Sequence, residues 1–285
     1  MPPERHPIAG PLLILGSALA FSTAGLFTRL LHTDVWTMLF WRGLFGGLFI
    51  AGFIAWRERG ATATAFRAIG RPGLLAGACS TLATICFINA LRLTTVADVT
   101  IIYATAPFIA AAIAWLWLRQ REGWLTLLAS LLALIGVVIM VDAAVSAGHL
   151  AGNLLALVMT GLMALMMVLV RRHRGISMLP ASCLSALACA ALVWPVAQPM
   201  AVTPAELLLL ALFGITQFGL GLLLLTLGSR LLSATRASLI ANLELPVAPF
   251  WVWLAFGEFP ALPTLIGGAI VLLAVALEMA AAPRE

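Results

Sequence analysis

Two stretches of the chain decide its fold: TVADVTIIYATAP at residues 95–107 and SATRASLIANLELPVAPFWVWLAFGE at residues 233–258. Each is apolar and carries a proline, Pro107 at the end of the first and Pro246 near the middle of the second, at an offset of about 140 residues. Weaker matches keep the same order and nearly the same offset: 9–13 with 151–155, 37–39 with 177–179, and 90–95 with 228–233. We therefore interpret the chain as an internal duplication.

The composition indicates that both copies lie in a membrane. Hydrophobic residues make up 63% of the 285 residues and charged residues only 9%, and the mean hydropathy of +1.10 is far above the soluble globular range. Apolar runs of about 20 residues, the length of a helix that crosses the bilayer, predict ten spans: 8–30, 35–55, 73–91, 96–118, 124–141, 151–170, 178–196, 206–227, 234–256 and 261–280. We expect an all-α integral membrane protein.

The number of spans determines how the two copies are related. Five spans fall in each half, which we bound at 1–143 and 144–285. Because five is odd, the second copy must lie upside down relative to the first. The sequence therefore predicts two inverted five-helix repeats that work as one unit.

The basic residues give the orientation. All 16 are arginine; with a cytoplasmic N-terminus, thirteen fall on the cytoplasmic side, two fall outside, and Arg42 alone lies within a span. Such a bias in short loops places both termini in the cytoplasm. The net charge of +5 is therefore a topology signal, and we expect no nucleic-acid partner.

The second proline-bearing span contains a carboxylate. Glu244 stands about eleven residues into the segment 234–256, roughly 16 Å along a helix and near the membrane midplane. Pro246 has no N–H to donate to the carbonyl of Asn242, so we expect a free carbonyl beside this carboxylate. Such a pair is suited to bind a substrate ammonium or to take up a proton. The alternative is a hydrogen-bonded Glu244 that locks the kink of the helix.

Polar side chains near both prolines are candidates to line a cavity. Tyr103, the only tyrosine, lies four residues before Pro107 and supplies the carbonyl that this proline leaves without a donor. Asn242 lies in the matching region of the second copy, and Gln217 lies within the segment 206–227. Irregular backbone is tolerated in a membrane where it lines a cavity. Ordinary hydrogen bonding between helices is the alternative for all three side chains.

Three charged residues are further candidates. Arg42, roughly 10 Å below the outer start of its segment, is suited to pair with a substrate carboxylate; structural pairing or contact with the interface are the alternatives. Its repeat counterpart lies near the uncharged Ser182. Asp98 and Arg236 occupy matching positions that inversion sends to opposite faces, so each is expected to cap its helix or form a gate contact, with Arg92 a partner for Asp98.

No constellation of catalytic or metal-binding residues is found in the sequence. The four histidines lie at segment ends or in loops, without metal-ligand spacing. The four cysteines lie in expected helices, where they act as small apolar residues. We therefore expect no metal, no cofactor and no enzymatic activity.

The stretch at 233–258, followed by LIGGAI at 265–270, resembles the repeat of EamA-type transporters in the drug/metabolite transporter superfamily. The first-half counterpart is TVADVTIIYATAP at 95–107, followed by Glu122 and by LIG at 134–136. The resemblance covers essentially the whole chain, including two five-helix copies and ten spans.

One loop departs from the family pattern. Glu122 follows Pro107 by fifteen residues, whereas Glu258 follows Pro246 by twelve. Arg121 precedes Glu122 where the family more often has glycine. The two loops therefore differ in length and in the residue before the glutamate.

The resemblance implies a transporter that exports small metabolites by alternating access. The chain is most similar to bacterial inner-membrane exporters of amino acids, including the aromatic type. The expected partners are a small-molecule substrate and the lipid bilayer, while the identity of the substrate and the oligomeric state stay open. A membrane-embedded enzyme acting on lipid and a scaffold that transports nothing are the alternatives.

Overall fold

The computed structural model describes residues 9–94, 96–119, 122–141, 150–173, 175–257, 259 and 262–281, and every regular element in these ranges is helical. The first half contains α1 (Ala9–Ser22), α2 (Ala24–Leu30), α3 (Val35–Glu58), α4 (Thr62–Ala68), α5 (Gly70–Leu93), α6 (Val96–Ala104), α7 (Ala106–Ile113), the π-helix η1 (Ala114–Leu118) and α8 (Trp124–Val141). The second half contains α9 (Leu150–Arg172), α10 (Leu179–Val193), the 3₁₀-helix η2 (Pro199–Ala201), α11 (Pro204–Leu212), the π-helix η3 (Phe213–Leu220), α12 (Gly221–Gly228), α13 (Ala234–Ala241), α14 (Glu244–Phe256) and α15 (Leu262–Ala281).

Seven helical segments in the described ranges are long and apolar enough to cross a membrane: Ala9–Leu30, Val35–Glu58, Val99–Leu118, Leu150–Arg172, Pro204–Gly228, Ala234–Phe256 and Leu262–Ala280. Two shorter apolar helices cover Trp124–Ile139 and Leu179–Val193. The helix α5, expected as a span, belongs to neither group. The chain is thus an all-helical, multi-pass membrane protein, and the number of ten spans stays a prediction.

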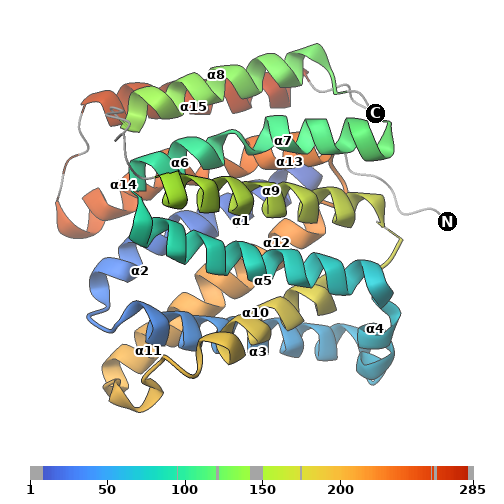
Figure 1. Cartoon of the computed structure of the whole chain (residues 1–285), viewed down its shortest axis with the longest axis vertical. Helices are drawn as coiled ribbons and strands as arrows, with labels where there is room; N and C mark the ends of the chain where they lie inside the picture. The colour runs from blue at the N-terminus through green and yellow to red at the C-terminus, as the bar shows by residue number, and fades with distance from the viewer. Residues whose placement is uncertain are drawn as a thin grey trace.

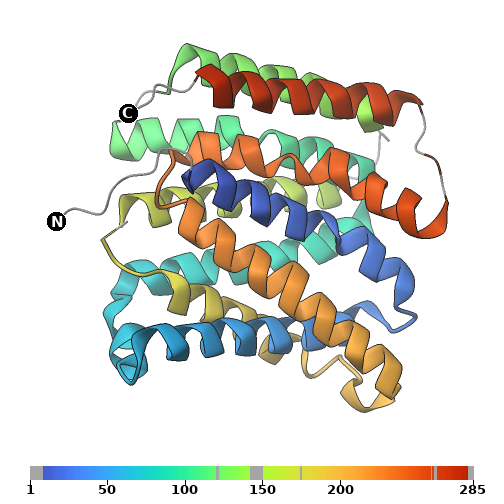
Figure 2. The same ribbon diagram turned by 180° about the vertical axis from the view of Figure 1, so that it is seen from behind.

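Each main helix packs against a helix of the other half. The closest pairs are α5 with α9, α8 with α15, α3 with α10, and α1 with α12. Figures 1 and 2 show the α8 and α15 pair along one edge of the bundle. Because the contacts cross between the halves, neither half has a separate core, and the two form one body.

Glycine allows the closest of these contacts. A Cβ atom added to Gly136 of α8 would lie 2.7 Å from the carbonyl oxygen of Gly267 in α15. No real side chain tolerates that distance, so only glycine lets the two backbones approach so closely. Small residues serve this purpose where helices associate in lipid, which offers no hydrophobic driving force between them.

The arrangement has two ends. α1 begins and α15 ends at one end of the bundle, which we call the terminal end, and we call the opposite end the distal end (Figures 1 and 2). The segments α6–α7 and α13–α14 run in opposite directions between these ends. α7 and α13, which lie toward the terminal end, pack against each other, whereas α6 and α14 make no comparable contact in the described ranges.

Polar caps hold helix starts at the distal end. Asp34 precedes α3, and its Oδ1 accepts hydrogen bonds from the backbone N–H groups of Trp36 at 2.9 Å and Thr37 at 3.1 Å. Thr203 and Glu206 form a capping box at the start of α11, where each side chain accepts a backbone N–H of the other residue. These caps satisfy N–H groups that a helix start leaves without partners.

Candidate functional site

The two proline-bearing segments are each broken near the middle, and they meet at the breaks. A turn at Thr105 separates α6 from α7, and a turn at Asn242 and Leu243 separates α13 from α14. Asn242 donates from Nδ2 to the carbonyl oxygen of Ala104, 3.4 Å away. This bond joins the two breaks directly, because Ala104 is the last residue of α6 and Asn242 directly follows α13.

The Asn242 side chain is buried, and only its amide nitrogen makes a hydrogen bond in the described part of the chain. Its residue is 1% exposed, and its Oδ1 atom accepts no hydrogen bond in the described part of the chain. A buried amide oxygen without a donor costs free energy of about 1–3 kcal/mol. The arrangement therefore leaves an acceptor at the crossing that a ligand or water is able to satisfy.

Glu244 and Tyr103 lie beside this crossing. Glu244 is the first residue of α14, Tyr103 is the penultimate residue of α6, and the two are close enough to interact electrostatically. Both side chains are partly exposed although they lie within spans. No hydrogen bond or ion pair to Glu244 is present among the described residues. Carboxylates within membrane spans are costly and mark ion or proton pathways in many membrane proteins, so Glu244 stays a candidate to bind a substrate ammonium or a proton.

One expectation about this region is wrong. The carbonyl of Asn242 was expected to be free because Pro246 has no N–H to give it. Instead it accepts the backbone N–H of Leu245 at 3.1 Å. The helix is interrupted at Asn242 and begins again at Glu244. The Asn242 carbonyl therefore accepts a hydrogen bond within a tight turn, and the missing N–H of Pro246 does not leave it without a partner.

A third broken helix borders the site, and no proline lies at its break. Thr23 separates α1 from α2. The hydroxyls of Ser22 and Thr23 donate to the carbonyls of Leu19 at 2.7 Å and Ala20 at 2.6 Å. Hydroxyls that bond back to preceding carbonyls bend helices, and the adjacent Ser–Thr pair was the available signal. The break also contacts α14, since Trp251 donates from Nε1 to the Ser22 oxygen at 2.8 Å.

Arg42 and Gln217 form a second polar group, between α3 and η3. The Arg42 Nη1 lies 3.4 Å from the Gln217 Oε1. The guanidinium also lies over the rings of Phe218, at 4.4 Å, and Phe213, at 5.6 Å. No hydrogen bond or ion pair among the described residues joins this group to Tyr103, Asn242 or Glu244.

The helix that presents Gln217 and both phenyl rings is irregular. η3 is a π-helix, a conformation that appears often at functional sites. Its backbone lies directly on α3, since a Cβ atom on Gly46 would lie 2.9 Å from the Gly214 carbonyl oxygen. The short approach fixes the positions from which Arg42 and Gln217 face each other.

Arg42 has no carboxylate within ion-pair distance in the described ranges. Its Nε is buried and makes no hydrogen bond there. At the matching place of the second half, the Ser182 and Thr226 hydroxyls lie 2.6 Å apart and line a small cavity. A buried cation is costly unless an anion pairs with it. The Arg42 group is therefore suited to receive the carboxylate of a ligand.

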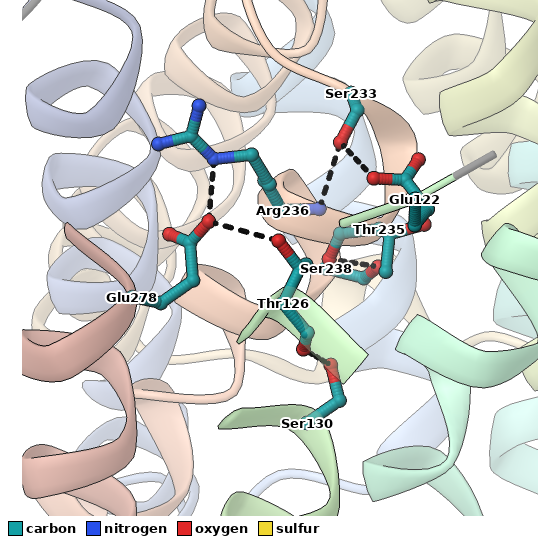
Figure 3. Close-up of polar contacts among 8 residues, drawn as sticks. All are labelled: Glu122, Thr126, Ser130, Ser233, Thr235, Arg236, Ser238 and Glu278. Atoms are coloured by element: carbon teal, nitrogen blue, oxygen red, sulfur yellow. Dashed lines mark hydrogen bonds and ion pairs between the residues drawn. The ribbon is translucent and has the colours of Figure 1, made fainter. Parts of the chain in front are cut away.

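A third polar group joins α13 to α8 and α15 toward the terminal end, and Figure 3 draws its residues. The Nε of Arg236 lies 2.6 Å from the Oε1 of Glu278, which is 4% exposed. The same carboxylate oxygen accepts the hydroxyl of Thr126 at 3.3 Å. Arg236 was expected to act as a cap or a gate. Sequence reasoning missed Glu278, although a carboxylate within an apolar segment is itself a signal.

A second contact ties the start of α13 to the chain before α8. The Ser233 hydroxyl accepts the backbone N–H of Arg236 at 3.3 Å, which caps α13. It donates to the Oε2 of Glu122 at 3.0 Å (Figure 3). The glutamate that the sequence comparison singled out thus binds a residue of the other half.

The remaining expected contacts fall outside the described residues. Asp98 belongs to α6, but its side chain is not described, and the same holds for Arg92 in α5. Glu258 is likewise outside. Among the residues that are described, no group of three or more His, Cys, Asp or Glu side chains is placed to hold a metal ion.

Comparison with known proteins identifies two copies of one family. The EamA-like transporter family matches residues 8–142 and again residues 150–279. None of the curated proteins matches the chain. A solved structure described only as "Crystal structure of protein" is 19% identical, with a TM-score of 0.82 over 97% of this chain and 99% of that one. At this identity the likeness supports the fold alone.

Proposed function

The chain belongs to the EamA-like transporter family, and on this premise we propose that it exports amino acids across the inner membrane by alternating access. Members of this family are membrane transporters of the drug/metabolite superfamily, which accounts for a small-molecule substrate and the lipid bilayer as partners. The proposal goes beyond the family in naming amino acids as the exported substrate. It rests on the two charged groups described above.

The meeting of two oppositely directed broken helices carries the proposal. Transporters built from inverted repeats bind their substrates near the midplane, where discontinuous helices of the two repeats face each other. Here Asn242 bonds to Ala104 across the two breaks, with Tyr103 and Glu244 beside them. The boundaries 1–143 and 144–285 make each broken helix the equivalent of the other in an inverted copy.

The orientation follows from the arginines. The terminal end is the cytoplasmic one in this proposal, because arginines gather where α3, α4 and α9 end: Arg57, Arg67, Arg171 and Arg172. Arginine-rich short loops stay in the cytoplasm. The distal end then faces outward, and both termini are cytoplasmic.

An amino acid offers one partner to each charged group. Its ammonium is suited to Glu244, beside Tyr103, and its carboxylate is suited to Arg42, which lies 3.4 Å from Gln217. Because no contact joins these two groups among the described residues, the transport cycle must bring them together to bind both charges of one α-amino acid. The rings of Phe213 and Phe218 around Arg42 add an apolar surface for an aromatic side chain. Pro107 and Pro246 keep the two helices broken where the substrate binds.

Counterflow in proteoliposomes tests this function. Vesicles that contain the purified protein and one unlabelled amino acid are placed in a trace of the same labelled compound, over a panel of all amino acids. We expect saturable accumulation for at least one of them, and none for its decarboxylated amine or its deaminated acid, since each lacks one charge. An enzyme acting on lipid or a scaffold gives no saturable flux with any compound, and that outcome overturns the proposal.

A further inference from the structure

We infer that Arg236, Glu278, Thr126, Ser233 and Glu122 form a terminal latch that keeps the cytoplasmic end closed, and that α13 swings about the break at Asn242 when the latch opens. The inference rests on the proposed alternating access, because that cycle requires the end that is sealed here to open. It identifies which contacts must break for this to happen.

The latch lies where it holds α13 most effectively. α13 has eight residues, with the break at Asn242 behind it and Ser233 in front. Arg236 and Ser233 make their contacts at the first turn, which is the end farthest from the break. A restraint at the free end of a short helix fixes its direction, while the break provides the bend.

The partners of α13 come from a different part of the bundle. Glu278 belongs to α15, and Thr126 belongs to α8, which pack along each other from opposite halves of the chain. Glu122 lies just before α8. The latch thus joins a broken helix, which is able to bend, to an unbroken pair that provides a fixed support.

Small residues are buried on both helices that meet at the terminal end. Ala110 of α7 and Ala237 of α13 are both fully buried, and α7 and α13 pack against each other. Alanines offer smooth surfaces that separate without interlocking. Apolar contact between helices gains little over contact with lipid, so the polar latch contributes the directional part of the closure.

The chemistry of the latch suits a bond that opens and closes. Glu278 is buried, yet its Oε2 accepts no hydrogen bond in the described part of the chain. Arg236 keeps 22% of its side chain exposed, so water reaches it when the pair separates. A polar network with an unsatisfied member is less stable than a complete one, which keeps the closed arrangement within reach of the open one.

Thiol accessibility from the cytoplasmic side tests the latch without any substrate. The four cysteines, none of which is in a disulfide, are replaced by alanine, and a probe is introduced as Ala110→Cys or Ala237→Cys. A membrane-impermeant methanethiosulfonate is applied to inside-out vesicles. We expect Glu278→Gln to raise the modification rate of both probes about tenfold, which corresponds to a shift of about 1.4 kcal/mol in the gate equilibrium.

Controls separate the latch from general loosening. Glu58→Gln changes a glutamate at the end of α3 that is outside the latch, and it is expected to leave both rates unchanged. Arg236→Gln breaks the same pair from the other side and replaces Glu278→Gln if that variant does not fold. Unchanged rates in a folded variant, or equal increases in Glu58→Gln, overturn the inference. A failed amino-acid assay leaves this test intact, because labelling requires no transport.

Discussion

The two halves of each broken helix differ in how they are held. Toward the terminal end, α7 and α13 pack together, and α13 is tied to α8 and α15 through Arg236 and Glu278. Toward the distal end, α6 and α14 make no comparable contact in the described ranges. The same pair of helices is thus closed at one end and separated at the other, which is the asymmetry that one state of an alternating-access cycle must have.

Removal of the arginine of the terminal latch should have the largest effect on stability. Arg236→Ala leaves the Glu278 carboxylate buried without its cation, and loss of one partner of a buried pair costs about 3–5 kcal/mol. The free energy of unfolding is measured by titration with SDS in mixed micelles. Arg67→Ala, at an exposed arginine of α4, should change it by less than about 0.5 kcal/mol. Equal losses in both variants would contradict a specific role for the pair.

The carboxylate at the crossing should matter for transport more than for stability. Glu244→Gln removes a charge-assisted bond to the substrate ammonium, worth about 1.5–3 kcal/mol, and should lower kcat/KM about 10- to 100-fold. If Glu244 also carries the coupled proton, wild-type flux depends on a pH gradient and the variant loses that dependence. Flux in vesicles with and without the gradient measures both effects. If flux through Glu244→Gln depends on the pH gradient as much as wild-type flux does, Glu244 does not carry the coupled proton.

A smaller effect is expected from the cap of α13. Ser233→Ala removes the acceptor for the Arg236 N–H and the donor to Glu122, and loss of such a cap costs about 1–2 kcal/mol. Hydrogen exchange should show faster opening confined to the first turn of α13. Exchange that rises equally in α14 would mean that the break at Asn242 does not separate the two segments.

The smallest effect is expected at the distal end, where Asp34 caps α3. Partial burial raises the pKa of Asp34, but the hydrogen bonds from Thr37 and Trp36 outweigh it and hold the pKa below its ordinary value of 3.8. The lowered pKa means that the stabilisation is present above that ordinary value and is lost as the pH falls through the native pKa. Asp34→Ala should cost about 0.5–1 kcal/mol at neutral pH. The difference from wild type should vanish in acid, and a constant difference would refute the cap.

The sequence located the crossing well but not the latch. Pro107 and Pro246 directed attention to Tyr103, Asn242 and Glu244, and the structure brings these three side chains to one place. Proline disrupts a helix in a known direction, so its neighbours are predictable. Glu278 was missed although a carboxylate within an apolar segment is a signal, because its partner Arg236 belongs to another helix of the same half, and the pairing of helices is not encoded locally.

Two further features had little or no sequence signal. The break at Thr23 arises from hydroxyls that bond to preceding carbonyls, a bond that most serines and threonines in membrane helices make without breaking the helix. The π-helix η3 places Gln217 toward Arg42, and nothing in FGITQFGL distinguishes it from an ordinary apolar helix. Both depend on packing between elements, which is why periodicity alone did not reveal them.

Distances across the two ends test alternating access most directly. Spin labels on Leu93 and Phe256 report on the distal end, and labels on Leu116 and Leu231 report on the terminal end; these four side chains lie at or near the ends of the relevant helices and are exposed. With a transported amino acid, we predict a shorter distal distance and a longer terminal distance in the same sample by double electron–electron resonance. Distances that stay unchanged, or that both change in the same direction, would contradict the account.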